Sequence, residues 1–203
     1  MIKPIILNID SGNILSLKNI IQQFSDKLKV TNLEEDITSA THIFLPGVGS
    51  YSEVMKKLNQ KINLKLLKKQ VFEKKIYLLG ICVGMQILSD FGYENEKYSG
   101  LSYINGKVEK LSTNEILPHV GWNSINFNNK NKILNKIPNK TDFYFTHSYA
   151  FNVTKSNNEI ANTNYGINFS SIINHDNIYG TQFHPEKSQS AGVILIKNFL
   201  DLN

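Results

Sequence analysis

The 203-residue sequence contains no arginine and a single cysteine, and each shortage excludes a class of function. Its 22 basic residues are all lysines, so the net charge of +5 lacks the planar guanidinium group with which proteins read bases and clamp phosphates. The lone Cys82 can form neither a disulfide framework nor a cysteine-pair metal site. We therefore expect no nucleic-acid partner, no metal and no cofactor.

Long apolar runs are missing as well. No stretch approaches the roughly 20 residues that a transmembrane helix needs, and the apolar start at residues 1–7 is too short for a secretory signal. The sequence thus predicts a cytoplasmic protein with no membrane partner. The 26 asparagines and many isoleucines that accompany the lysines are typical of AT-rich codon usage, which accounts for the basic charge.

The sequence does contain enough apolar material for one sizeable core. Hydrophobic residues make up 41% of the chain, and a chain of this length buries about 70% of its unfolded surface on folding. This length is typical of a single domain, which we expect to span residues 1–203.

The order of apolar patterns indicates the fold class. Short apolar runs alternate with stretches of helical spacing in the first half, and extended stretches dominate the second. This alternation predicts an α/β fold, a three-layer sandwich whose central sheet is mostly parallel, with antiparallel strands at one edge. We expect strands at 4–9, 42–45, 75–79, 101–108 (a hairpin around Asn105-Gly106), 120–127, 142–153, 165–173 and 177–183. We expect a helix from 13, one or two helices over 51–73, and further helices over 82–89 and over 191–200.

The sharpest motif is Gly80-Ile81-Cys82-Val83-Gly84, between an expected strand and an expected helix. A nucleophile on a sharp strand-to-helix turn needs small flanking residues, and here a cysteine replaces the serine of the G-x-S-x-G elbow. The start of the helix favours a thiolate over a thiol, and the N–H of Val83 is positioned to bind an oxyanion. The alternative, that Cys82 is a small buried apolar residue, does not account for the two glycines.

A thiolate that transfers an acyl group needs a proton shuttle, and five histidines compete for that role. His184 is favoured because it follows an apolar strand and precedes a proline and Glu186, whose carboxylate can hold the second ring nitrogen. His147 is the second candidate base. His42 and His175 lack supporting neighbours, and we expect them to be structural or exposed.

Pro46-Gly47-Val48-Gly49 closes another apolar strand. Its glycines can turn a backbone N–H toward a reacting carbonyl or away from it. We therefore assign the N–H groups of Gly47, Val48 and Gly49 to the oxyanion site, together with that of Val83. A tight strand-to-helix turn is the simpler alternative; a phosphate-binding loop is excluded because its spacing is missing.

Together these motifs resemble the class I glutamine amidotransferases, whose catalytic triad is Cys-His-Glu. The resemblance rests on residues 80–86 and 182–188. Three further stretches narrow the match to one group within the family; they are Leu45–Ser50, Pro118–Asn123 and Tyr144–Tyr149. With these stretches the chain is similar, over nearly its whole length, to the glutaminase subunits of imidazole glycerol phosphate synthase. The chain departs from their pattern at Val83, Thr146 and Ala150, and none of these departures removes a catalytic group.

The resemblance implies a flavodoxin-like fold and hydrolysis of L-glutamine to glutamate and ammonia through a thioester, with Cys82, His184 and Glu186 as the triad. It implies a heterodimer in which a (β/α)8 cyclase receives the ammonia and forms imidazole glycerol phosphate, in histidine biosynthesis. It assigns the substrate contacts to Gly49, Gln86, Ser148 and Tyr149. It places four residues toward the partner, namely Asn13, Trp122, Tyr144 and Lys187.

Other functions stay open at this point. A paralogue would feed ammonia to a surface-sugar amidotransferase. The class I glutaminases of anthranilate and vitamin B6 synthesis are disfavoured by the stretches 121–123 and 186–188, and that of carbamoyl phosphate synthesis by an extra N-terminal domain for which we expect no room in 203 residues. A cysteine hydrolase or peptidase on a similar sheet would work without a partner, and a non-catalytic regulatory protein could keep the same fold. Among the residues themselves, Asn13 is also a plausible helix N-cap, Trp122 a core aromatic and Lys187 a solvated lysine.

Overall fold

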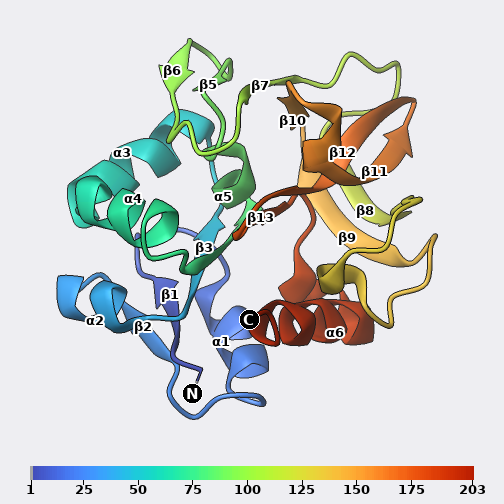
Figure 1. Cartoon of the computed structure of the whole chain (residues 1–203). Coiled ribbons are helices and arrows are strands. Elements are labelled where there is room, and N and C mark those ends of the chain that lie inside the picture. Colours follow the sequence, from blue (N-terminus) through green and yellow to red (C-terminus); the bar gives the residue numbers. More distant parts are fainter. Residues whose placement is uncertain (1) are drawn as a thin grey trace.

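The computed structural model describes residues 2–203 and has a seven-stranded sheet at its centre (Figure 1). In spatial order its strands are β11 (Glu159–Tyr165), β12 (Ile167–His175), β13 (Ile178–Thr181), β4 (Tyr77–Cys82), β3 (His42–Gly47), β1 (Pro4–Leu7) and β2 (Lys29–Thr31). Neighbours from β13 to β2 are parallel, whereas β12 is antiparallel to both β11 and β13. The sheet is therefore mixed and mostly parallel, with antiparallel strands at one edge, and this prediction is confirmed.

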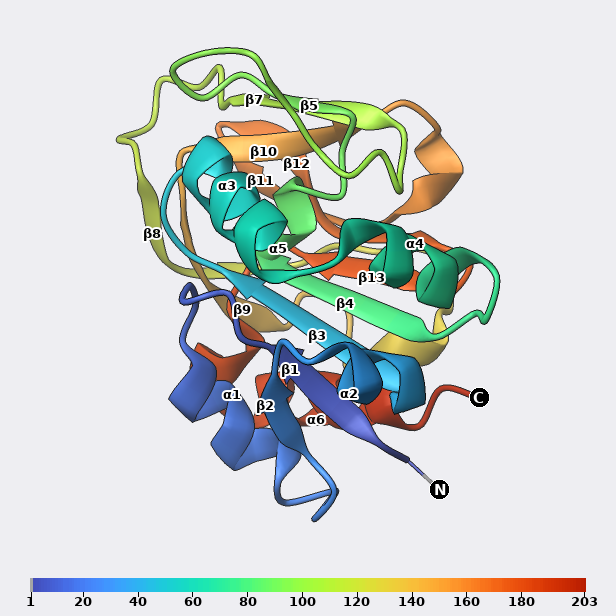
Figure 2. The same cartoon turned by 90° about the vertical axis from the view of Figure 1, so that its left-hand side faces the viewer.

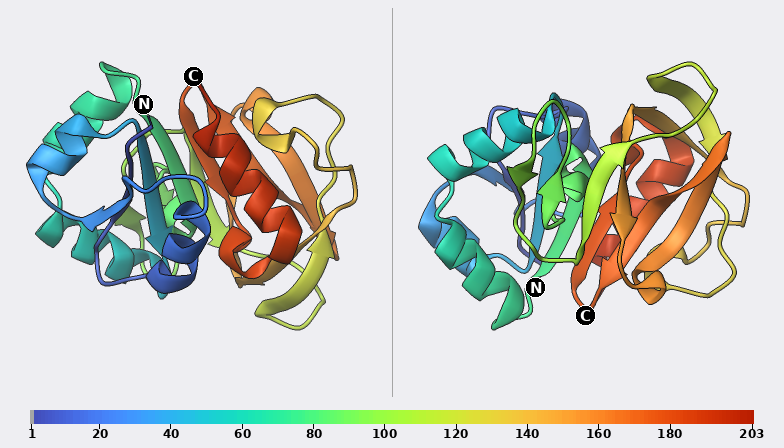
Figure 3. Two further views of the ribbon diagram at one scale, coloured as in Figure 1. Left: turned by 90° about the horizontal axis from the view of Figure 1, so that it is seen from below. Right: turned by 90° about the horizontal axis from the view of Figure 1, so that it is seen from above.

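Helices cover both faces of this sheet and complete a three-layer sandwich (Figure 2, Figure 3). One face is covered by α1 (Ile14–Ile21) and α6 (Gln189–Leu200), and the other by α2 (Glu34–Ser39), α3 (Tyr51–Lys61) and α4 (Leu64–Phe72). Strands that are covered on both faces must be apolar throughout, and every residue of β1 and β3 is buried.

Two smaller sheets lie beside the central one. A four-stranded sheet contains β10 (Tyr149–Val153), β7 (Gly106–Lys110), β5 (Phe91–Gly92) and β6 (Tyr98–Ser99). A two-stranded sheet contains β8 (His119–Ser124) and β9 (Asp142–His147). Short 3-10 helices follow at η1 (Lys132–Leu134), η2 (Ser156–Asn158) and η3 (Pro185–Lys187).

The predicted hairpin at Asn105-Gly106 is wrong. Gly106 begins β7, and its antiparallel partner is Val153 of β10, far along the chain. The other neighbour of β7 is β5, which runs parallel to it. Packing against a distant strand therefore overrides the local turn preference of an Asn-Gly pair.

Several helix boundaries also differ from the prediction. The stretch 51–73, predicted as one or two helices, forms two, because the Asn63 side chain accepts a hydrogen bond of 3.1 Å from Leu66 N and so begins α4. The helix expected over 82–89 is α5 (Val83–Gln86), which has only four residues. The sequence analysis missed β2 and α2, which are too short for a periodic pattern to emerge.

The parallel strands place their carboxyl ends together. Gly47, at the end of β3, is the register partner of Cys82, at the end of β4, and Thr181 of β13 pairs with the residue before Cys82. The loops after β1, β3, β4 and β13 therefore meet at one edge of the sheet, where α/β proteins bind ligands. No helix within residues 2–203 is both long and apolar enough to cross a membrane.

Candidate active site

Cys82 lies on a strained turn between β4 and α5. Its φ is +56° and its ψ is −113°, a conformation that residues with a side chain rarely adopt. The turn is also tightly packed, since a Cβ at Gly84 would lie 1.8 Å from the carbonyl oxygen of Leu45. The glycine two residues after the cysteine is thus required by the close approach of β3, as the elbow motif predicts.

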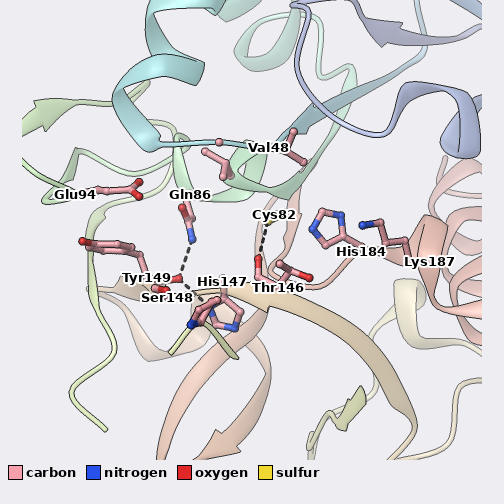
Figure 4. A pocket seen from close by; sticks show the side chains of 13 residues that line it. Val48, Cys82, Gln86, Glu94, Thr146, His147, Ser148, Tyr149, His184 and Lys187 are labelled. Atoms are coloured by element: carbon pink, nitrogen blue, oxygen red, sulfur yellow. Dashed lines mark hydrogen bonds between the residues drawn. The ribbon is translucent and has the colours of Figure 1, made fainter. Parts of the chain in front are cut away.

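His184 and Glu186 form a buried pair beside this cysteine. His184 directly follows the strand end, and its Nδ1 lies 2.9 Å from Glu186 Oε1, with both side chains less than 5% exposed. Burial alone would lower the pKa of His184, but Cys82 and Glu186 outweigh this effect and raise the pKa to about 10. His184 therefore carries a proton at neutral pH, next to the sulfur of Cys82 (Figure 4).

The second candidate base, His147, has both ring nitrogens engaged. Nδ1 lies 2.9 Å from the carbonyl oxygen of Tyr149, and Nε2 lies 3.2 Å from His119 Nδ1. Burial lowers the pKa of His147 to about 3, so the ring is neutral. The geometry thus favours His184 as the proton shuttle. Of the other histidines, His42 is buried and His175 exposed, in line with the expectation for them.

A pocket of about 320 Å³ opens beside Cys82 (Figure 4). Residues named by the sequence analysis that line it are Val48, Gly49, Cys82, Val83, Gln86, His147, Ser148, Tyr149, His184 and Lys187. The other named residues lie outside the lining; they are Asn13, Gly47, Trp122, Tyr144 and Glu186.

The sequence analysis missed three lining residues: Glu94, Pro118 and Thr146. Glu94 is fixed in place because its Oε2 accepts a 2.8 Å hydrogen bond from the N–H of Tyr51, the first residue of α3. It belongs to the polar segment between β5 and β6, where no sequence pattern distinguishes it from a solvated carboxylate. Pro118 and Thr146 lie within recognised stretches, but their side chains suggest no chemistry.

The turn after β3 is held in one setting by a serine from the loop after β1. The N–H of Val48 donates to Ser11 Oγ at 2.9 Å, and Ser11 Oγ donates in turn to the carbonyl oxygen of Val48 at 2.7 Å. The N–H of Val48, predicted as an oxyanion donor, is therefore engaged elsewhere in this conformation. Gly49, next along the turn, has a φ of +108°, which a residue with a Cβ would find strained.

One wall of the pocket is built from Gln86 and Tyr149. Gln86 is buried at the end of α5, and its Nε2 donates to the carbonyl oxygen of Tyr149 at 2.8 Å and to Gln182 Oε1 at 3.1 Å. Ser148 precedes Tyr149, and its carbonyl oxygen accepts a hydrogen bond of 2.9 Å from Leu111 N. The contact between Gln86 and Tyr149 therefore joins α5 to the start of β10.

Three of the four predicted partner residues form one cluster at the rim of the pocket. The rings of Trp122 and Tyr144 meet edge-on at 6.0 Å, and Lys187 Nζ lies 5.6 Å from the centre of the Tyr144 ring. Trp122 is 48% exposed, which contradicts the alternative reading as a core aromatic. Asn13 occupies the N-cap position of α1, without a capping hydrogen bond from its side chain.

Comparison with known proteins identifies the family. Residues 7–202 match the family described as Glutamine amidotransferase class-I. The chain therefore belongs to the class I glutamine amidotransferases, and it is a glutaminase-type enzyme. Within that family it belongs with the HisH subunits of imidazole glycerol phosphate synthase. It is 41% identical to the HisH subunit of Leptospira interrogans, over 97% of this chain and 98% of that one. It is 40% identical to a HisH subunit of Methanococcus maripaludis, over 96% and 97%.

Solved structures agree on the fold. A putative GMP synthase protein from Thermoplasma acidophilum matches with a TM-score of 0.74 and 18% identity, covering 98% of this chain and 93% of that one. PurLQS from Thermotoga maritima matches with a TM-score of 0.76 and 14% identity, covering 98% of both chains. The predicted fold class is thereby confirmed.

Proposed function

We propose that this chain is the glutaminase subunit of an imidazole glycerol phosphate synthase, and that it delivers ammonia from L-glutamine to a (β/α)8 cyclase in histidine biosynthesis. The observation that carries the proposal is the placement of Cys82 on a strained turn beside the buried His184–Glu186 pair. Full-length similarity to HisH subunits supports the pathway. Residues 1–203 act as one domain, in the cytoplasm, where a reactive thiol stays reduced.

The chemistry follows from the positions of the triad. The Cys82 thiolate attacks the side-chain amide carbon of glutamine, and the N–H of Val83 binds the oxyanion that forms. His184 gives its proton to the leaving nitrogen, so that ammonia departs and a γ-glutamyl thioester remains. His184 then takes a proton from water, which hydrolyses the thioester to glutamate and restores the thiolate. Glu186 keeps the imidazole oriented throughout.

The pocket wall suits the α-amino acid end of glutamine. Glu94 supplies a negative charge for the α-ammonium group, on the same side of the pocket as Gln86 and Tyr149 (Figure 4). Both Nε2 hydrogens of Gln86 are engaged within the protein, so Gln86 offers its Oε1, an acceptor, to the substrate. We assign Gly49, Gln86, Ser148 and Tyr149 to substrate binding, with Glu94 added to them.

The hydrogen bonds between Ser11 and Val48 support control of the glutaminase rate by the cyclase partner. With the N–H of Val48 engaged, the oxyanion site lacks one of its assigned donors, and one such donor is worth roughly 10²–10³ in kcat. In a second conformation of the turn, the N–H of Val48 would leave Ser11 and point toward the substrate. A cyclase that binds this second conformation more tightly than the first would switch the glutaminase on. A shift from 1:99 to 99:1 needs about 5.5 kcal/mol of differential binding. The Trp122–Tyr144–Lys187 cluster, at the pocket rim, is the surface we assign to that contact.

The test is glutamate production by the chain alone, with a cyclase, and with a cyclase and an acceptor analogue. We expect a slow rate for the chain alone and an increase of orders of magnitude for the loaded complex. Cys82→Ala should abolish hydrolysis in every mixture while leaving the fold intact. A glutamine-like electrophile should label the wild-type chain once, at Cys82.

Other outcomes would redirect the proposal. Labelling that persists in Cys82→Ala would remove Cys82 from the mechanism. Full activity from the chain alone would favour a stand-alone hydrolase, and stimulation by a sugar-modifying amidotransferase but not by a cyclase would favour the paralogous pathway. Inactivity in all mixtures, with a cyclase known to be competent, would favour a regulatory protein.

A further inference from the structure

Gln182 lies next to the nucleophile, and the mechanism above gives it no role. It follows β13, two residues before His184, and is fully buried. Its Nε2 lies 3.9 Å from Cys82 Sγ, and its Oε1 lies 3.1 Å from Gln86 Nε2. The orientation of the Gln182 amide matters. If its nitrogen faces the sulfur, it donates a hydrogen bond to Cys82; if its oxygen faced the sulfur, it would repel a thiolate.

The surrounding contacts fix that direction. The carbonyl oxygen of Tyr149 can only accept hydrogen bonds, so the Gln86 atom that lies 2.8 Å from it must be the amide nitrogen. The second hydrogen on that nitrogen faces the side chain of Gln182, which must therefore present its oxygen. The nitrogen of Gln182 is then the atom that faces Cys82.

Two histidines extend the same chain of hydrogen bonds away from the pocket. His147 donates from Nδ1 to the carbonyl oxygen of Tyr149 and, as a neutral ring, accepts at Nε2 from His119 Nδ1. His119 Nε2 accepts in turn from Asn123 Nδ2, at 3.3 Å. Each donor thus meets an acceptor from Asn123 to Tyr149, and both histidines are buried.

Besides His184, the sulfur of Cys82 has two polar neighbours, and they favour opposite protonation states of the thiol. The carbonyl oxygen of Thr146, at 3.8 Å, accepts a hydrogen bond from a thiol and repels a thiolate. The N–H of Gln182, at 3.9 Å, donates and so favours the thiolate, since a hydrogen bond to a charged acceptor is the stronger one. Gln182 therefore opposes Thr146 at the reacting atom.

We propose that Gln182 is a further catalytic residue, whose side-chain N–H stabilises the Cys82 thiolate, and that His119 and His147 are positioning residues that hold the carbonyl oxygen of Tyr149, on which the direction of the amide depends. The inference rests on the proposed role of Cys82 as the nucleophile. Its test does not need glutamine, because Cys82 is the only cysteine of the chain and any thiol reagent reports on it alone.

The experiment measures the rate of iodoacetamide alkylation of Cys82 between pH 4 and 10. We expect Gln182→Met, which keeps the length of the side chain and loses the donor, to move the midpoint of the profile up by about one pH unit, a tenfold lower rate on its acidic limb. Gln182→Glu should move it further, because a carboxylate repels the thiolate. The other titratable groups that line the pocket are Glu94, His147, Tyr149, His184 and Lys187, and Glu186 contacts His184; all variants retain them.

Matched variants separate this role from a structural one. Ser171→Ala alters a buried residue whose carbonyl oxygen binds the backbone N–H of Gln182, and it should leave the profile unchanged. His119→Phe keeps the ring stacking against Phe145 and Tyr165 but loses the donor, and should move the midpoint upward by a smaller amount. His119→Asn restores a donor near the position of Nδ1, and it should bring the midpoint of the profile back to the wild-type value.

An unchanged profile in folded Gln182→Met and Gln182→Glu would overturn the inference. Equal shifts in His119→Phe and His119→Asn would overturn the part assigned to the histidines. If the wild-type chain proved inactive on glutamine with every partner while these shifts appeared, the proposed function would fail and the assignment of Gln182 would stand. Far-UV circular dichroism and the melting temperature of each variant establish that it is folded.

Discussion

At the residue scale, the choice of proton shuttle depends on two histidines in opposite states. His184 is held protonated beside Cys82, whereas His147 is held neutral with both ring nitrogens engaged. We expect His184→Asn to reduce kcat/KM in the loaded complex nearly as much as Cys82→Ala, because the two residues act as a unit. Glu186→Gln should cost less, since it orients the ring. His147→Asn should be milder still, because asparagine retains a donor near Nδ1.

The measurement is steady-state glutaminase kinetics of the four variants with the partner present. An essential His147 beside a dispensable His184 would reverse the assignment of the base. A Glu186→Gln variant as inactive as Cys82→Ala would mean that the charge of Glu186, and not only its orientation of the ring, is required.

The reactive residues could be predicted from the sequence because each lies next to a local signal. Cys82 lies between two glycines after a strand, and His184 and Glu186 flank a proline. Ser11 and Gln182 carry no comparable signal for their roles, because these depend on contacts between residues far apart in the chain. Serine is common in this chain and glutamine has no distinctive chemistry of its own, so only the fold distinguishes the ones that act.

At the scale of elements, the loop after β1 fixes the conformation of the loop after β3. The hydroxyl of Ser11 accepts a hydrogen bond from the N–H of Val48 and donates one to its carbonyl oxygen, so both backbone groups of Val48 are held. We expect Ser11→Ala to raise the glutaminase rate of the chain without a partner, by up to the roughly 10²–10³ that one oxyanion donor supplies.

The control for this prediction is Ser16→Ala, in the first turn of α1, because both of these hydrogen bonds to Val48 involve Ser11 and neither involves Ser16. It should leave the rate of the chain alone unchanged. A Ser11→Ala chain that is folded and no faster than the wild type would show that the turn is held by something other than this hydroxyl.

The elements that the sequence predicted best are those with long apolar patterns. The buried parallel strands and α6 lie close to their expected positions, because the core selects an apolar residue at almost every position or on one helical face. The small sheets were not predictable, since β5 and β6 have two residues each. Their pairing partners are set by tertiary packing, as the strand that begins at Gly106 illustrates.

At the scale of the whole molecule, three buried neutral histidines make stability depend on pH. Burial lowers the pKa of His42 and of His119 to about 4 and that of His147 to about 3. The unfolded chain takes up these protons below its ordinary pKa of about 6.5, whereas the folded chain does not. The free energy of unfolding therefore falls as pH drops from 6.5 toward 4, by up to about 1.4 kcal/mol per pH unit for each histidine.

His184 has the opposite effect. Its pKa is raised in the fold, so its contribution is complete below about pH 6.5 and is lost as pH rises through about 10. We expect the greatest stability near pH 6.5, measured by urea unfolding across the range. His42→Phe keeps an aromatic ring against Tyr77 and Phe199 and should reduce the acidic slope by about a third. An unaltered slope would contradict the burial of a neutral His42.

The hydrogen bonds between Ser11 and Val48 also have a consequence for how a cell uses its glutamine nitrogen. A glutaminase that runs while no acceptor is ready releases ammonia into water, where it is lost to the intended reaction and the glutamine is wasted. If the turn controls the glutaminase as we propose, this idle loss is set by one hydroxyl group on a loop outside the triad. Natural selection can therefore adjust how closely glutamine use follows demand by changing the side chain at position 11, without altering Cys82, His184 or Glu186.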